Sequence, residues 1–328
     1  QPATPDIKQT ISNVCSLPIE RIISAPDVYS IYDVPVNFEK ENFGSILLKT
    51  IGLSPRQKDL SDWMALADKI KKIKKEIRIG IVGKYFNFKS CKDTYISVIE
   101  SINHATWALD FKPNIVWLDS EKYENNVNLL GELDKLDGIV IPGGFGNRGV
   151  EGMILAADYA RRKKIPYFGL CLGMQILIIS YARNVLKFND ANSTEMNPNT
   201  MYPVIATMTD QVEKIKNKNY GGSMRLGAYD CVLTKDTIAF GSYKAYKISE
   251  RHRHRYEVNI KYIAELEKAG LVFSGKSPDG VLMEIAELPK KIHPFYLGTQ
   301  FHPEFKSRPL VPHPLFTTFI KACIGKKK

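Results

Sequence analysis

Apolar and polar positions follow two different spacings along the middle of the chain. Four short apolar runs predict buried strands over residues 77–83, 114–118, 138–142 and 165–170. The stretches between and after them carry apolar residues at helical spacing and predict helices over 91–109, 150–162 and 172–183. Because strands that alternate with helices form parallel sheets with helices on both faces, this pattern predicts an α/β fold.

The pattern changes after Thr200, where helical spacing becomes rare. Five runs of β-type residues predict strands over 202–208, 231–234, 271–274, 282–287 and 295–300. We therefore expect a β-rich C-terminal part added to the α/β core.

The first 76 residues have another character. Residues 1–55 contain many prolines and short apolar runs, which predict irregular structure with a few short strands or turns and no core of its own. Over 59–76, apolar residues recur at helical spacing between lysines and predict an amphipathic connector helix that Ser61 caps. The first residues lack an initiator Met and a basic-then-apolar leader, so we expect a piece of a longer polypeptide without a secretory signal.

Composition narrows the class of protein. Hydrophobic residues make up 44% and charged residues 25% of the 328 positions, which is typical of globular proteins and excludes a disordered or fibrous chain. No window approaches the roughly 18 apolar residues that a membrane helix needs. The net charge of +11 is compatible with binding to nucleic acid, but much of the excess lies in Lys69–Lys75 and at the C-terminus. A solvated helix face and a frayed tail account for both, so we predict neither nucleic acid nor membrane as a partner.

The five cysteines are widely spaced and include no CxxC pair. This spacing supports neither a disulfide framework nor a zinc site, and it predicts a reducing, cytoplasmic compartment.

One cysteine stands in a distinctive setting, the string GLCLGMQ over 169–175, between a predicted strand and a predicted helix. G-x-C-x-G at such a junction is the thiol version of a nucleophile elbow, in which small glycines let the chain turn sharply. The N-terminus of the following helix favours a thiolate, which is the reactive form. The sequence therefore predicts Cys171 as a nucleophile, and the alternative is an inert buried cysteine between two chance glycines.

A second candidate group is QFHPEF over 300–305, at the end of the last predicted strand. His302 can reach over the sheet edge towards the elbow, and Glu304 can accept a ring N–H and orient the imidazole. Alone, His302 would be read as an ordinary hydrogen-bonded histidine; together with Cys171 it predicts a Cys-His-Glu triad.

A third candidate is the glycine-rich turn PGGFG over 142–146, which can offer backbone N–H groups to negative charge. With the amide of Leu172 it would form an oxyanion hole. A phosphate-binding turn is the alternative, although the turn lacks the residues of a P-loop and the spacing of a dinucleotide site.

These three motifs, in this order, resemble the class I glutamine amidotransferases. The resemblance narrows to the glutaminase half of the cytidine triphosphate synthase family through strings over 143–149, 190–195, 221–227 and 250–259, of which RHRHRYEVN is the most specific. Residues 27–35, DVYSIYDVP, resemble the end of that family's synthetase domain.

The resemblance implies a flavodoxin-like fold with a central, mostly parallel sheet flanked by helices. It implies three parts: a synthetase remnant over 1–55, a linker helix over 56–76 and an amidotransferase domain over 77–325. Cys171, His302 and Glu304 would be catalytic, without a metal. The residues implied to bind L-glutamine are Gly144, Leu172, Gly173, Met174, Gln175, Glu195 and Arg255. From the residues alone, Glu195 would be a loop cap and Arg255 part of an exposed basic strand.

For the complete family, the resemblance implies ammonia transfer to a synthetase domain that uses ATP and magnesium to convert UTP to CTP. No P-loop with a Lys-Gly ending occurs in this chain, so no cofactor is expected to bind here. GTP activation near Arg225 and a homotetramer are further implications. A γ-glutamyl hydrolase and a catalytically silent scaffold, recruited through the basic helix, are the alternatives.

Overall fold

The computed structural model describes residues 2–55, 57–84, 91–207 and 224–326. The chain divides into two compact units, residues 1–74 and 75–328. No helix in the described ranges is long and apolar enough to cross a bilayer. The string over 221–227 is described only from Met224 onward, and Met208 at the end of a predicted strand also lies outside the described ranges.

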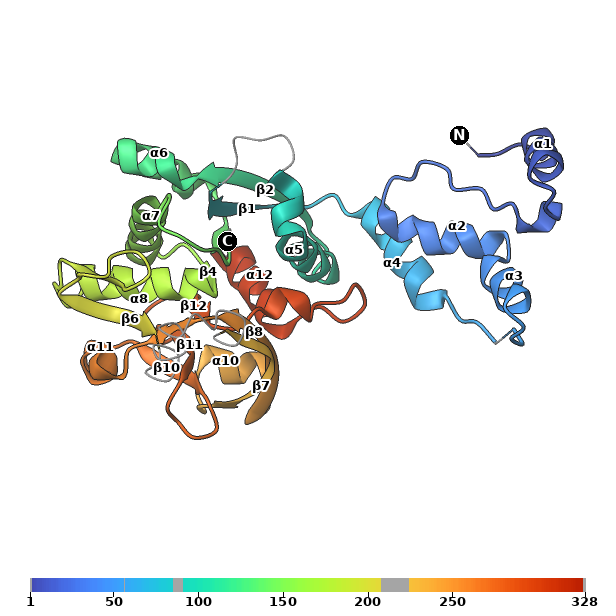
Figure 1. Ribbon diagram of the computed structural model, residues 1–328. Helices are drawn as coiled ribbons and strands as arrows, with labels where there is room; N and C mark the ends of the chain where they lie inside the picture. Colours follow the sequence, from blue (N-terminus) through green and yellow to red (C-terminus); the bar gives the residue numbers. More distant parts are fainter. Residues whose placement is uncertain (1, 56, 85–90, 208–223, 327–328) are drawn as a thin grey trace. The chain divides into compact units, whose positions relative to one another are not determined.

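The first unit is helical (Figure 1). Its elements are α1 (Pro5–Cys15), η1 (Ile19–Arg21), η2 (Ile31–Asp33), α2 (Val34–Lys40), α3 (Phe43–Thr50) and α4 (Ser61–Lys72). The expectation of short strands was therefore wrong: Pro5 sits in the first turn of α1, where its missing N–H costs nothing, and Thr4 caps that helix. Ser61 is not a cap either, because it is the first residue of α4 and its amide donates to Asp59.

The described buried apolar side chains of this unit are few: Tyr32, Leu66, Ala67 and Ile70. Large apolar side chains on α1 and α3 remain exposed, among them Ile7, Val14 and Leu47.

The second unit is built on a nine-stranded sheet in the order β2-β1-β3-β4-β12-β11-β10-β7-β8. The strands are β1 (Glu76–Gly83), β2 (Lys112–Asp119), β3 (Gly138–Ile141), β4 (Tyr167–Leu170), β7 (Arg225–Leu233), β8 (Lys247–His254), β10 (Val272–Lys276), β11 (Met283–Glu287) and β12 (Tyr296–Thr299). Neighbours from β2 to β12 pair in parallel, and those from β12 to β8 pair antiparallel. The structure thus contains the predicted parallel core with a β-rich extension.

Three shorter strands form a second sheet in the order β5-β6-β9. They are β5 (Ala191–Ser193), β6 (Tyr202–Thr207) and β9 (Tyr256–Val258). The helices of the second unit are η3 (Cys91–Tyr95), α5 (Ile96–Ala108), α6 (Ser120–Asn125), η4 (Val127–Lys135), α7 (Val150–Lys163), α8 (Leu172–Asn184), α10 (Ile238–Tyr243), η6 (Ile260–Tyr262), α11 (Ile263–Lys268), η7 (Pro303–Phe305) and α12 (Pro314–Lys326).

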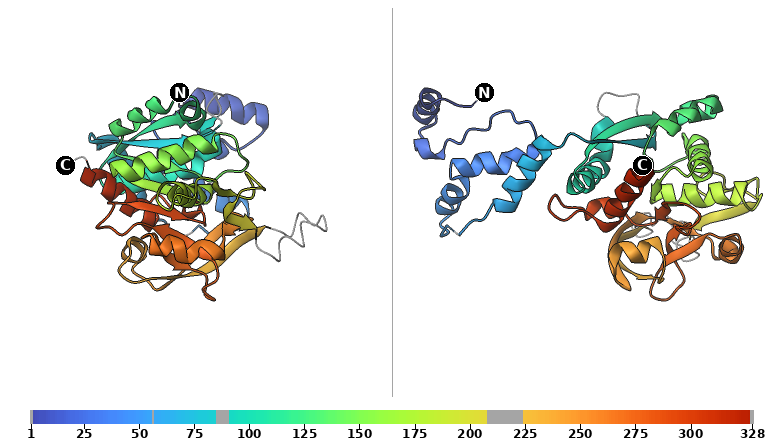
Figure 2. Two further views of the ribbon diagram at one scale, coloured as in Figure 1. Left: turned by 90° about the vertical axis from the view of Figure 1, so that its left-hand side faces the viewer. Right: turned by 180° about the vertical axis from the view of Figure 1, so that it is seen from behind.

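Helices cover both faces of the large sheet, and alternate strand residues point to opposite faces (Figures 1 and 2). In β4, Tyr167 packs into the cluster with α7 and α8, whereas Phe168 packs into the cluster with α5 and α12. Within the second cluster, Phe168 contacts Phe316 and Phe319 of α12, with ring centroids 5.0 and 5.8 Å apart. The sequence did not predict α12, although this helix closes one face of the core.

Candidate active site

Cys171 lies between β4 and α8, at the carboxyl edge of the parallel strands. Leu170 of β4 pairs with Thr299 of β12, and the Cys171 amide donates to the Thr299 carbonyl at 2.7 Å. Cys171 has a φ of +52°, a strained backbone that the surrounding structure must hold. The helix α8 begins at the next residue, so its N-terminal dipole favours negative charge on the sulfur.

The glycine two residues later allows this turn to sit against the sheet. A Cβ atom at Gly173 would lie 2.2 Å from the carbonyl oxygen of Ile141, at the end of β3. Only a residue without a side chain fits there, because the clash is with backbone. The close approach that the G-x-C-x-G string predicts is therefore present in the fold.

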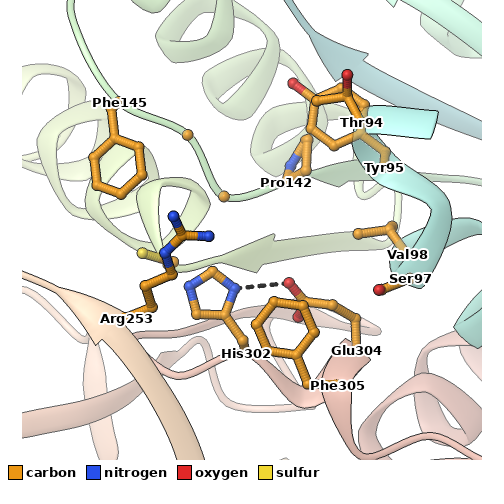
Figure 3. A pocket seen from close by; sticks show the side chains of 13 residues that line it. Thr94, Tyr95, Ser97, Val98, Pro142, Phe145, Arg253, His302, Glu304 and Phe305 are labelled. Atoms are coloured by element: carbon orange, nitrogen blue, oxygen red, sulfur yellow. Dashed lines mark hydrogen bonds and ion pairs between the residues drawn. The ribbon is translucent and has the colours of Figure 1, made fainter. Parts of the chain in front are cut away.

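His302 and Glu304 follow β12 and lie beside Cys171. The ring Nδ1 of His302 is 2.7 Å from Glu304 Oε1, and since a carboxylate accepts, Nδ1 donates and Nε2 faces away from Glu304 (Figure 3). A Cβ atom at Gly143 would lie 2.8 Å from Cε1 of His302 and 3.6 Å from Cβ of Cys171. Imidazole and thiol therefore flank the same glycine, although the two residues are 131 positions apart.

The electrostatics of His302 depend on these two neighbours. Burial by itself lowers the pKa of His302, but hydrogen bonding to Cys171 and Glu304, together with their charges, raises it to about 10. Nε2 has no hydrogen-bond partner of good geometry among the described residues, even though the sulfur is near enough to raise the pKa. A protonated imidazole next to a cysteine sulfur is an arrangement that can activate the sulfur as a nucleophile.

A pocket of about 270 Å³ opens over these three residues (Figure 3). Its lining also includes the predicted glycine-rich turn and residues of η3 and α5. Phe305 stacks on the His302 ring, with centroids 5.1 Å apart and planes at 15°. Arg253 lines the pocket as well, whereas Arg255 does not. Sequence reasoning missed Arg253, although it lies in the same RHRHR string.

Four residues form a second group near the elbow: Gln175, Glu195, Arg255 and Tyr256. Glu195 accepts a hydrogen bond from the Gly146 amide at 3.0 Å, and Gln175 donates to the Tyr256 carbonyl at 3.2 Å. Burial and the charge of Glu195 raise the pKa of Tyr256, while the charge of Arg255 lowers it, so the two charges lie near one phenol. The group thus contains a cation and an anion, both of which an amino acid substrate requires.

Lys84 follows β1 directly and binds the glycine-rich turn through hydrogen bonds. It is 1% exposed, and its ammonium donates to the carbonyls of Phe145 and, at 3.0 Å, of Gly146. Burial lowers the pKa of Lys84, and the charge of Glu195 opposes this shift. Lys84 was not predicted as a site residue, and its one signal in the sequence is a lysine directly after a predicted buried strand.

Behind the site lies a buried charged cluster around Arg225. Its guanidinium is 2.7 Å from Glu284 and 3.5 Å from Glu257, and Glu257 is 3.4 Å from His254. Burial and the charge of Glu284 raise the pKa of Glu257 to about 8, and burial lowers that of His254 to about 3. Arg225, expected from the resemblance to be linked to GTP, thus has two carboxyl partners within the fold, Glu284 and Glu257, and the raised pKa of Glu257 favours its protonated form at pH 7. Among the described residues, no group of three or more His, Cys, Asp or Glu side chains is arranged to hold a metal ion.

Comparison with known proteins agrees with this architecture. Residues 90–322 match the glutamine amidotransferase class-I family. The chain is 48% identical to a CTP synthase of Clostridium kluyveri over 322 residues, and 45% identical to one of Methanocaldococcus jannaschii over 331 residues. These matches cover 98% and 99% of this chain but only 58% and 60% of the two relatives.

Among solved structures, the chain is similar to the Trypanosoma brucei CTPS glutaminase domain with bound acivicin. The TM-score is 0.70 at 40% sequence identity, and the match covers 76% of this chain and 94% of that one. The family match spans the elbow, the glycine-rich turn and the His-Pro-Glu segment. This chain therefore belongs to the class-I glutamine amidotransferases.

Proposed function

We propose that this chain is the glutamine-hydrolysing part of a CTP synthase and that Cys171, His302 and Glu304 are its catalytic residues. The observation that carries the proposal is the placement of His302 between Glu304, 2.7 Å from Nδ1, and the Cys171 elbow. The two relatives are CTP synthases, each longer than this chain, which supports CTP synthesis as the purpose of the released ammonia.

In the proposed reaction the Cys171 thiolate attacks the side-chain amide carbon of glutamine. Backbone amides of Gly144 and Leu172 stabilise the oxyanion, at about 3 kcal/mol for each donor. His302, protonated on Nε2, gives that proton to the leaving nitrogen and ammonia departs. Water then adds to the γ-glutamyl thioester, His302 takes its proton, and the C–S bond breaks to give glutamate.

The second group supplies recognition of the substrate's amino acid end. Glu195 is suited to the α-ammonium and Arg255 to the α-carboxylate. Leu172, Gly173, Met174 and Gln175 form the first turn of α8 and complete the glutamine site.

The remaining expectations concern the complete enzyme. Residues 1–55 would be the end of a synthetase domain, and the exposed apolar side chains of α1 and α3 support its continuation beyond this chain. ATP, magnesium, UTP, GTP, a homotetramer and a cytoplasmic location all remain predictions for that longer protein. This chain by itself should make no CTP from UTP and ammonia.

Replacement of the nucleophile tests the proposal directly. Cys171→Ala should abolish glutamine hydrolysis, and adduct formation with a glutamine-analogue electrophile, while circular dichroism stays that of the parent. The exposed Cys15 supplies the matched control, since Cys15→Ala should keep both reactions. Glutamine turnover by Cys171→Ala would refute the triad, and faster turnover of a poly-γ-glutamate than of glutamine by the parent would favour a γ-glutamyl hydrolase.

A further inference from the structure

Gln300 is a fully buried residue whose side chain reaches the nucleophile from the side of β12. Its amide nitrogen Nε2 lies 3.7 Å from Cys171 Sγ, within hydrogen-bond range for sulfur. Its backbone amide donates to the backbone carbonyl of Glu284 at 2.8 Å, which fixes the main chain at this point. Gln300 is the first residue of the QFHPEF segment, which also contains His302 and Glu304. The proposed roles of the triad do not explain why a buried amide faces the sulfur.

The orientation of the Gln300 side-chain amide follows from that of the Gln175 side-chain amide. Gln175 Nε2 lies 3.2 Å from the Tyr256 carbonyl oxygen and 3.3 Å from Gln300 Oε1. A backbone carbonyl only accepts, so the NH₂ group of Gln175 must face Tyr256. The same NH₂ group donates its other hydrogen to Gln300 Oε1, and Nε2 of Gln300 is then the atom that faces the sulfur.

We propose that Gln300 donates a hydrogen bond to the Cys171 sulfur and stabilises its thiolate form, and that Gln175 is the positioning residue that fixes the Gln300 amide. This inference rests on the proposed function. A hydrogen bond to an ionised acceptor is about twice as strong as a neutral one, and exclusion of water strengthens it further.

The donor matters most when the thioester breaks. As the C–S bond cleaves, its electron pair moves to the sulfur, while the proton of the attacking water goes to His302. Gln300 is neutral at every pH of interest, so it offers its hydrogen to the departing sulfur whatever the protonation state of His302. It therefore stabilises the leaving thiolate independently of the imidazole.

The test is the pH dependence of Cys171 alkylation by iodoacetamide, followed by mass measurement of the Cys171 peptide. Gln300→Met removes the donor at similar volume and should slow alkylation at pH 7 about tenfold, moving the rate profile about one pH unit upward. Gln300→Glu places a carboxylate against the sulfur and should move the rate profile further towards high pH. Gln9→Met, on the exposed face of α1, is the matched control and should leave the profile unchanged.

Gln175→Met provides an independent variant, since it leaves the Gln300 donor but removes the group that orients it; we expect a smaller fall in the same direction. Profiles of Gln300→Met and Gln175→Met that coincide with the parent's would overturn the inference. Glutamine hydrolysis by the parent is measured in parallel. If the parent hydrolyses no glutamine, the proposed function fails, while a shifted alkylation profile would still support the hydrogen bond to sulfur.

Discussion

Gly173→Ala is the substitution for which the structure gives the sharpest expectation. The added methyl carbon would stand 2.2 Å from the Ile141 carbonyl oxygen and 3.1 Å from its carbonyl carbon. Both are backbone atoms of the sheet, so no side-chain rotation relieves the clash. The first turn of α8, which carries the Leu172 amide and follows Cys171, must therefore move away from β3.

Gly241 is a matched control for the effect of Gly173→Ala on the free energy of unfolding. Gly241 also lies in a helix, α10, and a Cβ atom there would meet nothing within 4 Å. Gly241→Ala should therefore raise the free energy of unfolding by about 0.5–1 kcal/mol, the usual helix preference of Ala over Gly. Gly173→Ala should instead lose about 1–3 kcal/mol to overpacking. A shift of about 1 Å at the elbow should also slow the reaction at Cys171 roughly 100-fold.

Two measurements check both halves of this expectation. Urea denaturation gives the free energy of unfolding of each variant, and the labelling rate of Cys171 by a glutamine-analogue electrophile gives the reactivity of the elbow. If Gly173→Ala proved as stable and as reactive as Gly241→Ala, the close packing of α8 on β3 would not be what positions the nucleophile.

Two further substitutions probe charge in the site and behind it. Glu304→Gln keeps the side-chain volume but removes the carboxylate from His302, so kcat/KM for glutamine should fall about 10²- to 10⁴-fold and the pKa of His302, followed by NMR, should drop; unchanged turnover would argue against the triad. Glu257, with its pKa raised from 4.5 to about 8, holds a proton in the folded protein that the unfolded chain releases. Its stabilising contribution is therefore complete below pH 4.5 and is lost as pH rises through 8, at up to about 1.4 kcal/mol per pH unit. In urea titrations from pH 5 to pH 8, the free energy of unfolding of Glu257→Gln should fall less steeply with pH than that of the parent. Equal slopes in the two proteins would contradict the proposed protonation of Glu257.

The parallel core could be predicted because β1, β3 and β4 are nearly continuous apolar runs, as strands buried on both faces must be, whereas the edge strand β2 is only partly buried. The His-Pro-Glu segment could be placed at the end of a strand within reach of the elbow, but the parallel pairing of that strand, β12, with β4 could not be predicted, because residues 295–300 were assigned to the β-rich addition and pairing between distant segments leaves no local signal. The helices α1 and α12 were not predicted, although the local signal was present: apolar residues recur at helical spacing in both, at Ile7, Ile11 and Val14 and at Leu315, Phe316, Phe319, Ile320 and Cys323.

The buried polar residues were the hardest part of the site to predict. Nothing in the sequence indicates that Arg225 and Lys84 are buried, because their burial depends on partners brought together by the fold: Glu284 and Glu257 for Arg225, and the turn carbonyls for Lys84. Gln300 could be located next to His302, but the direction of its amide depends on Gln175, 125 positions earlier. Such roles require coordinates.

The position of β12 between β4 and β11 has a consequence for synthesis of the protein on the ribosome. The strand that fills the centre of the sheet also leads directly to His302, and among the described strands it is the last to be made. A nascent chain that already contains Cys171 but ends before β12 therefore lacks both the central strand of the sheet and His302. The central strand and His302 therefore depend on the same late segment, and we expect a chain that terminates before β12 to lack both.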